Sequence, residues 1–327
     1  MFWLKIFAGF LVGAWLLLFW YLRNPVFSYG QKIDAADVSP EVLEASVRAL
    51  TGIVPPRQFE NASSMLAAEK YVETEFQKLG YVVTKQDVFA HEKNYHNLVV
   101  RYGDANAKEI IVVGAHYDVC GNQSGADDNA SGVAGIIELA RLLQKNQPKL
   151  KFPVELVVYS LEEPPFFGGR DMGSAIHADL LSEGGVSVRC MVSLEMIGYF
   201  SHAAFSQHFD PPIMHLWYPW TGDFIGIVGT PADRELVKSF KAAMIPNSSI
   251  PVYSINAPRV MPGVDFSDHR NYWDHNWPAV MITDTAFFRN EQYHASGDTP
   301  DRLDYKSMAQ VIQGVYAAIA DPIFNGR

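Results

Sequence analysis

The chain begins with an apolar stretch that no charged residue interrupts. Between Lys5 and Arg23 lies the sequence IFAGFLVGAWLLLFWYL, which as a helix is about as long as one bilayer span. Pro25 and polar residues end the stretch at once, so a helix buried inside the folded domain is the less favoured interpretation. The pattern predicts a single-pass membrane anchor over residues 1–23 and one folded domain over residues 24–327.

Aromatic residues and flanking charges refine this expectation. A secretory signal would have a shorter apolar region and a small-residue cleavage site, whereas Trp15, Trp20 and Tyr21 occur where an anchor meets the membrane interface. A retained anchor is therefore expected. Lys5 and Arg23 nearly balance each other, so the positive-inside rule orients the anchor only weakly. Our hypothesis is that the folded domain faces the extracytoplasmic side.

Helical periodicity follows the anchor. The segments SPEVLEASVRAL and ENASSMLAAEKYVETEFQKLG repeat apolar residues at helical spacing, and Gly80 supplies a stop signal. Residues 38–80 are therefore expected to form a helical start to the domain. The next segments, YVVTKQDVFA and YHNLVVRYG, are typical of partly exposed strands that could pair as neighbours.

Four later segments are apolar on both alternating faces and rich in β-branched residues. They are EIIVVGAH, PVELVVYSLEE, RCMVSLEM and PAVMITDTAF. Strands of this kind belong to a parallel sheet that is covered on both sides. Helical patterns lie between and after them, notably over residues 133–143 and 303–319. This alternation predicts an α/β fold, a three-layer α/β/α sandwich with a central mixed, mostly parallel sheet.

Composition and charge narrow the classes of protein. A chain of 327 residues with 48% apolar and 13% aromatic residues can bury a large core, which excludes a disordered chain and a small disulfide-stapled scaffold. The net charge of −10 and the lack of a long basic run argue against nucleic acid as a partner. The two cysteines, Cys120 and Cys190, are expected to be free thiols at opposite edges of the sheet.

Acidic residues and histidines gather at the carboxyl ends of the four buried strands. That edge of an open α/β sheet is the usual ligand-binding crevice. No lysine or arginine adjoins the three glutamates in sequence, and buried carboxylates without a compensating charge are unfavourable. A zinc, manganese or cobalt ion would compensate them, because imidazole and carboxylate suit these metals. A metal-binding core is thus expected over residues 95–327, with candidates His116, Asp118, Glu162, Glu163, Glu195 and His294.

The segment GAHYDVCGNQSGADDNASGVAGIIELAR strengthens this expectation. It joins a strand end to a glycine-rich turn and then to an amphipathic helix. Asp127 or Asn129 could cap that helix. Two adjacent aspartates are more than a cap requires, and the carboxylate of Asp127 or Asp128 could bridge two cations.

Five motifs in order resemble the signature of the zinc exopeptidases of clan MH. They are HYD, GADDNASG, LEE, LEMIGY and YHASGDTPD, and the similarity runs from about Lys70 to the carboxyl end. This family includes bacterial leucyl aminopeptidases, glutamate carboxypeptidase and the glutaminyl cyclases. The resemblance implies two zinc ions, with manganese or cobalt as substitutes. The implied ligands are His116 and Glu195 for one ion, Glu163 and His294 for the other, and Asp128 as the bridge.

The resemblance also implies a mechanism. Glu162 matches the family's general base, which takes a proton from the metal-bridging water and delivers it to the leaving amine. Asp118 would accept a hydrogen bond from His116 and fix its tautomer. Asp127 is left as a neighbour of the bridge or a helix cap. A metal-dependent exopeptidase acting on peptides is implied, and an aminopeptidase that cleaves N-terminal peptide bonds is the leading subclass.

Several alternatives stay open. Glu195 stands where aminopeptidases of this family usually have aspartate, which leaves the subclass less firm than the metal site. A carboxypeptidase-type activity, a one-zinc glutaminyl cyclase and a non-catalytic receptor-like protein use the same fold. Retention of all five ligands favours two-metal hydrolysis. A calcium-binding interaction module is disfavoured, because calcium prefers oxygen ligands to imidazole.

The substrate pocket is the least specified part. The segment VDFSDHRNYWDHNWPAVMITDTAFF resembles the family's approach to the last strand, so Ser267, Asp268 and His269 are candidates for shaping the pocket. The alternative is an ordinary helix start. Tyr293 is either a packing residue or an oxyanion contact. The long aromatic segment SHAAFSQHFDPPIMHLWYPWTGDF favours a pocket with an apolar lining.

Overall fold

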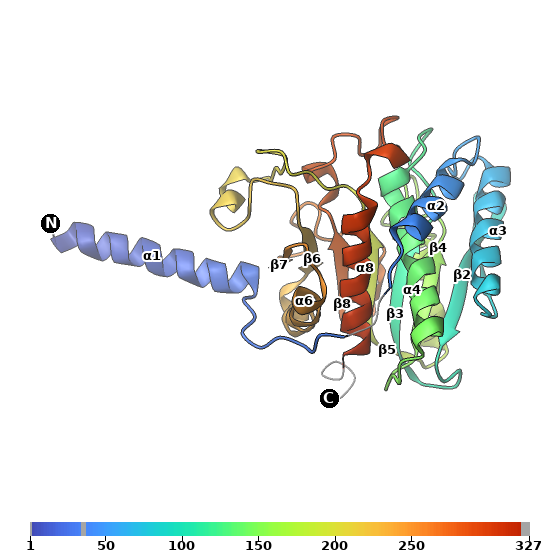
Figure 1. Ribbon diagram of the computed structural model, residues 1–327, viewed down its shortest axis with the longest axis horizontal. Coiled ribbons are helices and arrows are strands. Elements are labelled where there is room, and N and C mark those ends of the chain that lie inside the picture. Colours follow the sequence, from blue (N-terminus) through green and yellow to red (C-terminus); the bar gives the residue numbers. More distant parts are fainter. Residues whose placement is uncertain (1, 34–36, 322–327) are drawn as a thin grey trace.

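An eight-stranded mixed sheet forms the centre of the computed structural model, which describes residues 2–33 and 37–321 (Figure 1). The strand order is β1-β2-β4-β3-β5-β8-β6-β7. Four neighbouring pairs are parallel and three are antiparallel. The strands are β1 (Thr84–Ala90), β2 (Lys93–Tyr102), β3 (Glu109–His116), β4 (Val154–Tyr159), β5 (Ser187–Glu195), β6 (Ile225–Gly229), β7 (Val252–Asn256) and β8 (Ala279–Thr283).

The four strands that the sequence marks as doubly covered lie side by side in the middle of the sheet. β4, β3, β5 and β8 are parallel neighbours, and every residue of β4 and β8 is buried. Strands without a solvent face need apolar side chains in both directions, which is the pattern that these segments show. The expected pairing of β1 with β2 is also confirmed, with Thr84 opposite Val99.

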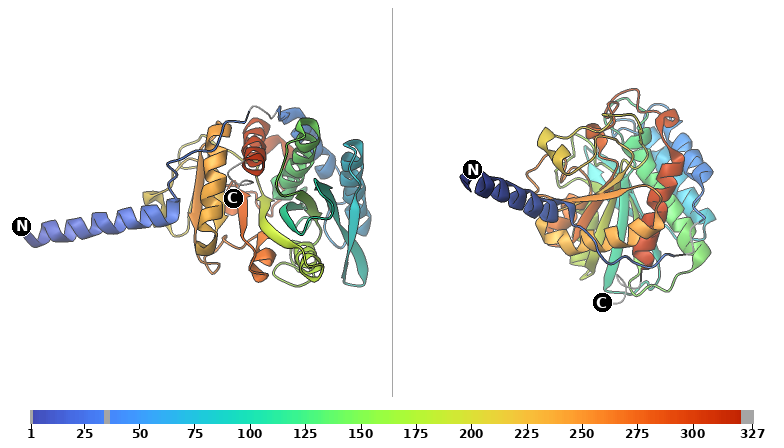
Figure 2. Two further views of the ribbon diagram at one scale, coloured as in Figure 1. Left: turned by 90° about the horizontal axis from the view of Figure 1, so that it is seen from below. Right: turned by 60° about the vertical axis from the view of Figure 1, so that its left-hand side comes forward.

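Helices cover both faces of the sheet and complete the three layers (Figure 2). On one face, five helices pack over side chains such as Val113, Leu156 and Val192. On the other face, α5 and α7 pack over the alternate residues, such as Val112 and Val157. The predicted three-layer sandwich is therefore confirmed. The helices of the domain are α2 (Pro40–Thr51), α3 (Ala62–Lys78), α4 (Gly132–Asn146), α5 (Gly173–Glu183), α6 (Arg234–Asn247), α7 (His269–Asp274) and α8 (Tyr305–Ala320).

The hydrophobic pattern does not predict two of the strands. β6 pairs in parallel with β7, and it joins the central sheet through antiparallel pairing with β8. The β6 segment, IGIVG, is short and contains two glycines, so its intrinsic strand preference is weak. Its strand state depends on β8, which lies much later in the sequence.

Both cysteines are free, as the sequence predicts. Cys120 follows the carboxyl end of β3, and Cys190 is buried within β5.

The helix α1 (Phe2–Arg23) projects from the domain (Figure 1). Among the described helices, it alone contains a window, Lys5–Arg23, that by length and composition could cross a membrane, and none of that window is buried. Its base is fixed to the domain. Arg234 Nη2 donates to the carbonyl of Trp20 at 2.9 Å, and Ser254 Oγ donates to the carbonyl of Arg23 at 3.0 Å. These contacts satisfy carbonyls that would otherwise lack partners at the end of the helix.

Candidate metal centre

The predicted site residues meet at one end of the sheet. His116 ends β3, Glu162 and Glu163 follow β4, and Glu195 ends β5. Parallel strands present their carboxyl ends at one edge, so these side chains converge although they are far apart in sequence. The loop after β8 brings His294 to the same place, within contact distance of Glu163.

One group of possible ligands contains His116, Asp128 and Glu195. All three residues are buried, and their candidate ligand atoms lie within 4.8 Å of one another. His116 Nε2 lies 3.4 Å from Glu195 Oε2 and 3.5 Å from Asp128 Oδ1. Tetrahedral zinc with bonds of about 2.0–2.1 Å would separate its ligand atoms by roughly 3.4 Å. The spacing in this group therefore fits one ion.

A second group contains Glu163 and His294. His294 Nε2 lies 3.1 Å from Asp128 Oδ2 and 3.2 Å from Glu163 Oε2. Asp128 thus directs one carboxylate oxygen toward His116 and the other toward His294, which is the arrangement that a bridging carboxylate needs. Cys120 also belongs to this group, since its Sγ lies within 4.8 Å of the ligand atoms of Glu163 and His294. Sequence reasoning did not place Cys120 there.

A tight turn before α4 fixes the position of Asp128. Gly125 has φ 60°, and a Cβ at this position would lie 2.2 Å from Val119 Cγ1 and 2.3 Å from the Asp128 carbonyl oxygen. Only glycine fits such a close approach. The backbone N–H of Asp128 donates to Asp298 Oδ2 at 3.1 Å, and that of Asp127 donates to Asp298 Oδ1 at 2.9 Å. Asp298, in the motif YHASGDTPD, thus holds the turn, a role that the sequence does not reveal.

Asn129 ties this turn to the end of β5. Its Nδ2 donates to the carbonyl of Leu194 at 2.9 Å, and its Oδ1 accepts from the backbone N–H groups of Met196 and Gly132, each at 3.1 Å. Asn129 therefore caps the start of α4 and positions the strand end that carries Glu195. Asp127 is not part of a ligand group. Its Oδ1 accepts from the N–H of Gly198 at 3.0 Å, so it is a neighbour that fixes the adjoining loop.

The Asp118 carboxylate has a larger role than the sequence predicts. Its two oxygens accept hydrogen bonds from the backbone N–H groups of Glu162 and Glu163, at 3.1 Å and 3.0 Å. His116 Nδ1 lies 3.2 Å from the Asp118 carbonyl oxygen and 3.5 Å from its Oδ1, so the carbonyl is the nearer acceptor. Asp118 therefore orients both glutamates through the backbone while it adjoins the histidine.

A buried arginine supports the loops beneath the site. The Arg57 guanidinium donates to the carbonyls of Tyr117 and Gly125, both at 2.9 Å. Burial lowers the pKa of Arg57 to about 10. These bonds connect the loops that carry Asp118 and Asp128, and no sequence motif points to Arg57.

The site gathers more negative charge than its protein surroundings compensate. Burial, together with Asp128, raises the pKa of Glu163 to about 8, and burial raises the pKa of Glu162 well above its ordinary value. Burial alone would lower the pKa of His294, but Asp128 and Glu163 outweigh it and raise that pKa to about 10. Asp128 Oδ2 is buried and accepts no hydrogen bond of good geometry, although His294 Nε2 lies 3.1 Å away. A buried site of this kind attracts a cation, and its nitrogen and oxygen donors fit zinc.

Residues 97–319, which make up most of the chain, match peptidase family M28. The chain belongs to this family. Because M28 peptidases depend on metal ions, the protein is a metallopeptidase and a hydrolase, as expected. The uncharacterized protein YfbL of Escherichia coli is 45% identical over 318 residues, which cover 93% of this chain and 97% of YfbL. The probable aminopeptidase YDR415C of Saccharomyces cerevisiae is 29% identical over 244 residues, which cover 70% of this chain and 57% of that protein.

Solved structures share the fold of this M28 peptidase. The LapA aminopeptidase of Legionella pneumophila has a TM-score of 0.69 at 19% identity, covering 87% of this chain and 69% of that chain. The Bacteroides thetaiotaomicron glutaminyl cyclase bound to N-acetylhistamine has a TM-score of 0.65 at 18% identity, covering 88% of this chain and 99% of that chain. At these identities the likeness concerns the fold, and it agrees with the predicted sandwich.

Ser267, Asp268 and His269 lie beneath the site of the M28 peptidase, not in its wall. All three are fully buried, and none lines the hollow above the metal ligands. Ser267 Oγ donates to Glu195 Oε2 at 2.7 Å, whereas His269 Nε2 lies 2.9 Å from the carbonyl of Val264. The segment is the start of α7, which was the alternative interpretation. These buried side chains therefore do not line the cleft, although Ser267 contacts Glu195, which does.

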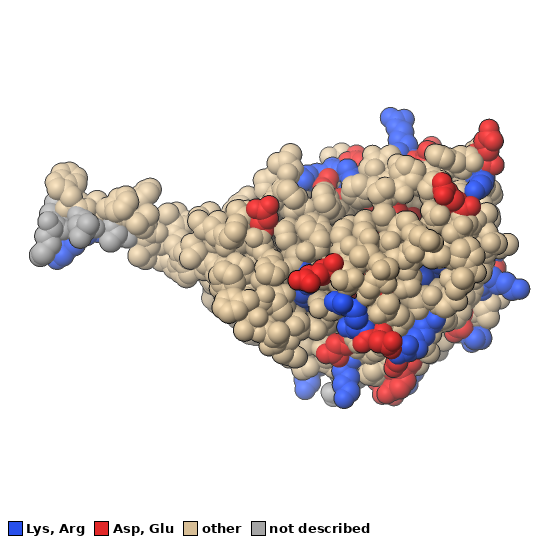
Figure 3. All heavy atoms as spheres, turned by 90° about the horizontal axis from the view of Figure 1, so that it is seen from above, with Lys and Arg blue, Asp and Glu red and all other residues tan. Residues whose placement is uncertain are grey.

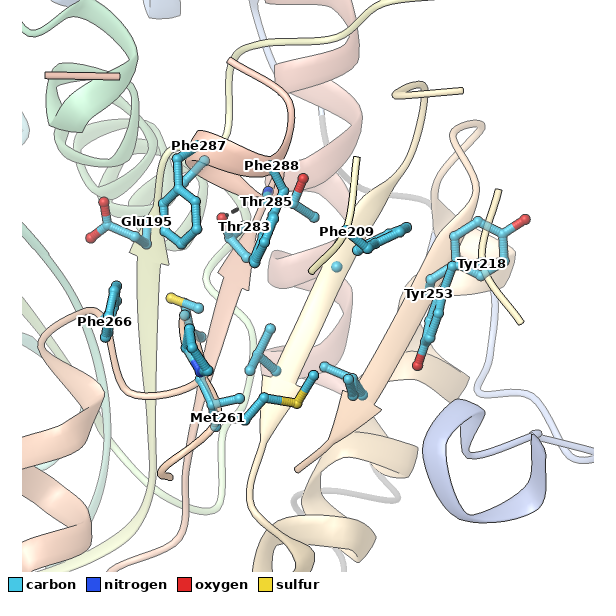
Figure 4. Close-up of a pocket in the computed structure, with 18 of the residues that line it drawn as sticks. Glu195, Phe209, Tyr218, Tyr253, Met261, Phe266, Thr283, Thr285, Phe287 and Phe288 are labelled. Carbon is cyan, nitrogen blue, oxygen red and sulfur yellow. Dashed lines mark hydrogen bonds between the residues drawn. The ribbon is translucent and has the colours of Figure 1, made fainter. Parts of the chain in front are cut away.

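A hollow of about 570 Å³, counted with the solvent at its mouth, lies over the two ligand groups. Glu162 and Tyr293 both line it. Tyr293 stacks on His294 with ring centroids 3.8 Å apart. A second hollow opens beside the first and shares Glu195, Phe266 and Tyr293 with it (Figure 4). Among the described residues that line the two hollows, there is no lysine or arginine.

Proposed function

We propose that this M28 peptidase is a two-zinc aminopeptidase. His116 and Glu195 would hold one zinc ion, Glu163 and His294 would hold the other, and Asp128 would bridge them. Support comes from the two ligand groups, which share Asp128 and adjoin one hollow. Zinc bound there would lower the pKa of an attacking water and polarise the scissile carbonyl.

Glu162 acts as the general base. It lines the hollow, and its Oε2 lies 3.9 Å from His116 Nε2. The pKa of a general base should lie near the working pH, and burial raises the pKa of Glu162 in that direction. Glu162 would accept a proton from the attacking water and deliver it to the nitrogen of the leaving amine. Asp118 keeps Glu162 in place through the backbone hydrogen bond.

The absence of basic residues from the two linings favours amino-terminal over carboxyl-terminal substrates. A carboxypeptidase needs a cation, usually arginine, to bind the free carboxylate of its substrate. The described residues that line both hollows include no arginine or lysine, whereas four carboxylates are present in the first hollow. Such a lining offers no partner for the free carboxylate of a carboxyl-terminal residue. This is the observation that carries the choice of an aminopeptidase.

Glutaminyl cyclisation is the second candidate, because solved glutaminyl cyclases share the fold. The resemblance to those enzymes implies one zinc ion, whereas this chain has ligands for two. Elemental analysis of the purified full chain distinguishes the two proposals. Two zinc ions per chain are expected, and one ion together with cyclisation of an N-terminal glutamine would favour the cyclase.

The direct test is an assay of the full chain, purified in detergent, on amino-acid nitroanilides and on carboxypeptidase substrates. We expect hydrolysis of the nitroanilides, loss of that activity with a chelator and recovery with added zinc. The carboxypeptidase substrates should remain intact. Activity that persists after complete metal removal would overturn the proposal.

We also propose that residues 1–23 anchor the protein in a membrane and that the catalytic domain, residues 24–327, lies outside the cytoplasm. The exposed apolar surface of α1 supports an anchor. On the face seen in Figure 3, α1 and the adjoining end of the domain carry fewer charged residues than the opposite end. Protease treatment of intact cells should degrade the domain. Full protection until the membrane is permeabilised would reverse the orientation.

A further inference from the structure

The second hollow is far more apolar than the cleft over the metal ligands. It encloses about 900 Å³, counted with the solvent at its mouth, and we call it the apolar channel. Glu195 lies at one end of the channel, and Tyr218 and Tyr253 lie at the other (Figure 4). Aromatic residues and methionines, including Phe209 and Met261, make up nearly half of the lining residues, and Asp210 adds a carboxylate.

The channel runs across the sheet. Residues of three strands line it: Met281 and Thr283 on β8, Gly226, Ile227 and Val228 on β6, and Tyr253, Ser254 and Ile255 on β7. Because β5, β8, β6 and β7 are successive neighbours, the channel crosses three strand spacings from Glu195 to β7. At the usual spacing this is roughly 14 Å. A leucine side chain would fill only the part of the channel nearest the metal ligands.

The far end of the channel lies at the base of α1. Tyr218 and Met214 line the channel, and they belong to an apolar cluster on which Phe19 and Leu22 of α1 pack. The Arg23 guanidinium lies 4.3 Å from the ring centroid of Tyr253. The channel therefore leads from the ligand groups toward the helix that we propose as the anchor.

Exposed apolar side chains continue this surface outside the channel. The loop between β5 and β6 exposes Phe205, Ile213, Leu216 and Trp220, each by nearly half or more of its surface. Large exposed apolar residues of this kind are typical of surfaces that contact lipid or other apolar partners.

We propose that the apolar channel binds a long, uncharged hydrocarbon chain on the substrate residue whose carbonyl is cleaved, a chain longer than any genetically encoded side chain. The proposal rests on the proposed aminopeptidase activity and defines its substrate class. Hydrolysis breaks the amide C–N bond and forms a C–O bond from water. One proton of that water reaches the amine by way of Glu162, and the hydrocarbon chain takes no part in the chemistry.

Burial of apolar surface predicts how the rate should depend on chain length. Each methylene that leaves water contributes enough to raise kcat/KM about fourfold when it is bound in the transition state. A channel that spans three strand spacings should sustain this gain beyond the length of leucine or norleucine. A pocket closed at that length would instead reject longer chains by steric overlap.

The test uses the full chain in phosphatidylcholine vesicles, with nitroanilides of alanine, norleucine, 2-aminooctanoic acid and 2-aminodecanoic acid. We expect kcat/KM to rise along the whole series. A maximum at norleucine, followed by a fall, would overturn the proposal. Loss of all hydrolysis, alanine included, would instead refute the aminopeptidase activity itself, so the two failures are distinguishable.

Two variants test whether the rise of kcat/KM with hydrocarbon length arises from binding in the apolar channel. Ile255→Trp fills the far half of the channel from β7, and Met261→Trp fills it from a loop, so one can replace the other if folding fails. Each should lower the ratio of kcat/KM for 2-aminodecanoyl over alanyl nitroanilide at least tenfold. Leu180→Trp, on exposed surface of α5, is the matched control and should leave the ratio unchanged. An unchanged ratio in both channel variants would contradict the proposal.

The same substrates can show whether the natural substrate, which carries the hydrocarbon chain, is soluble or resides in a membrane. They are offered as monomers in solution or embedded in the vesicles that hold the enzyme. Preference for long chains in either form supports the proposal. Faster turnover of the embedded form identifies a bilayer-resident substrate, and faster turnover of the monomer identifies a soluble lipid-modified peptide.

Discussion

Ser267 Oγ donates a hydrogen bond of 2.7 Å to Glu195 Oε2. Ser267 is fully buried just before α7, and its hydroxyl also lies 2.7 Å from Ser193 Oγ. Asn129 Nδ2 approaches the same glutamate oxygen at 3.4 Å. A neutral hydroxyl and an amide therefore fix the carboxylate that faces His116. Such contacts determine where a ligand oxygen points, and hence how well it can hold a metal ion.

Removal of the Ser267 hydroxyl should weaken the metal site without removing a ligand. We expect Ser267→Ala to lower zinc affinity or kcat/KM about 10- to 100-fold, as is usual for residues that orient metal ligands. Zinc titration of the metal-depleted chain measures the effect. Ser193→Ala is the matched control, because Ser193 contacts Ser267 and not Glu195. Equal effects of both variants would mean that general packing, and not the bond to Glu195, is responsible.

Replacement of Glu162 by Gln should separate metal binding from turnover. The amide keeps the size of the side chain but cannot accept a proton, so kcat should fall about 10²- to 10⁴-fold. Zinc content should stay at the value of the unchanged protein, because Glu162 is not a proposed ligand. Elemental analysis and steady-state kinetics measure the two quantities. Normal turnover in this variant would refute the role of general base.

Loss of one imidazole should remove one ion. We expect His294→Ala to reduce the zinc content from about two ions to about one per chain, since the other group, His116, Asp128 and Glu195, stays complete. His202→Ala is the control, because His202 is exposed, lies near Asp223 and belongs to neither ligand group. Retention of both ions in His294→Ala would show that His294 is not a ligand.

Metal binding should weaken as the pH falls. Asp128 and Glu163 outweigh burial and raise the pKa of His294 to about 10, and burial raises the pKa of Glu163 to about 8. Both groups hold protons at neutral pH that a zinc ion must displace. For each proton that zinc displaces, the apparent zinc affinity should fall about tenfold when the pH falls by one unit. Competition with a zinc-binding dye at pH 6 and pH 8 measures this. An affinity independent of pH would contradict the proposed ligand set.

His269 should make the stability of the folded chain depend on pH. Burial lowers its pKa to about 3, and its Nε2 lies 2.9 Å from the carbonyl of Val264. Between that value and the unfolded pKa of about 6.5, only the unfolded chain binds the proton, so this group removes stability as the pH falls below about 6.5. The loss should approach about 1.4 kcal/mol per pH unit.

Denaturant unfolding of the full chain at pH 7.5, 6.0 and 5.0 tests this expectation. His269→Asn lacks the titrating group and should show a smaller loss of stability over the same range. Identical pH profiles for the two proteins would show that His269 does not carry the effect.

The sequence alone predicts the central strands and the cluster of ligands. The segments of β3, β4, β5 and β8 are apolar in both directions because each is covered on both faces, and this signal is local. The acidic residues and histidines lie at their carboxyl ends, and parallel pairing brings such ends to one edge. For this reason His116, Glu163 and Glu195 could be grouped before any contact was known.

The parts that the sequence does not reveal depend on partners far along the chain. β6 is a strand because β8 lies beside it, and its own segment, IGIVG, gives little sign of that state. Asp298 and Arg57 hold the loops around the ligands through hydrogen bonds to backbone groups, which leave no pattern in the sequence. For Ser267 the sequence left a pocket residue and a helix start as alternatives, and only the folded chain brings its hydroxyl to Glu195.

Short-range patterning therefore determined which segments of this M28 peptidase are buried and which residues can bind metal. Tertiary packing alone decided how each ligand is oriented, because orientation comes from single hydrogen bonds such as that between Ser267 and Glu195. It also decided that an apolar channel leads from Glu195 to the base of α1. That channel is formed by strands and loops that only the folded chain brings together.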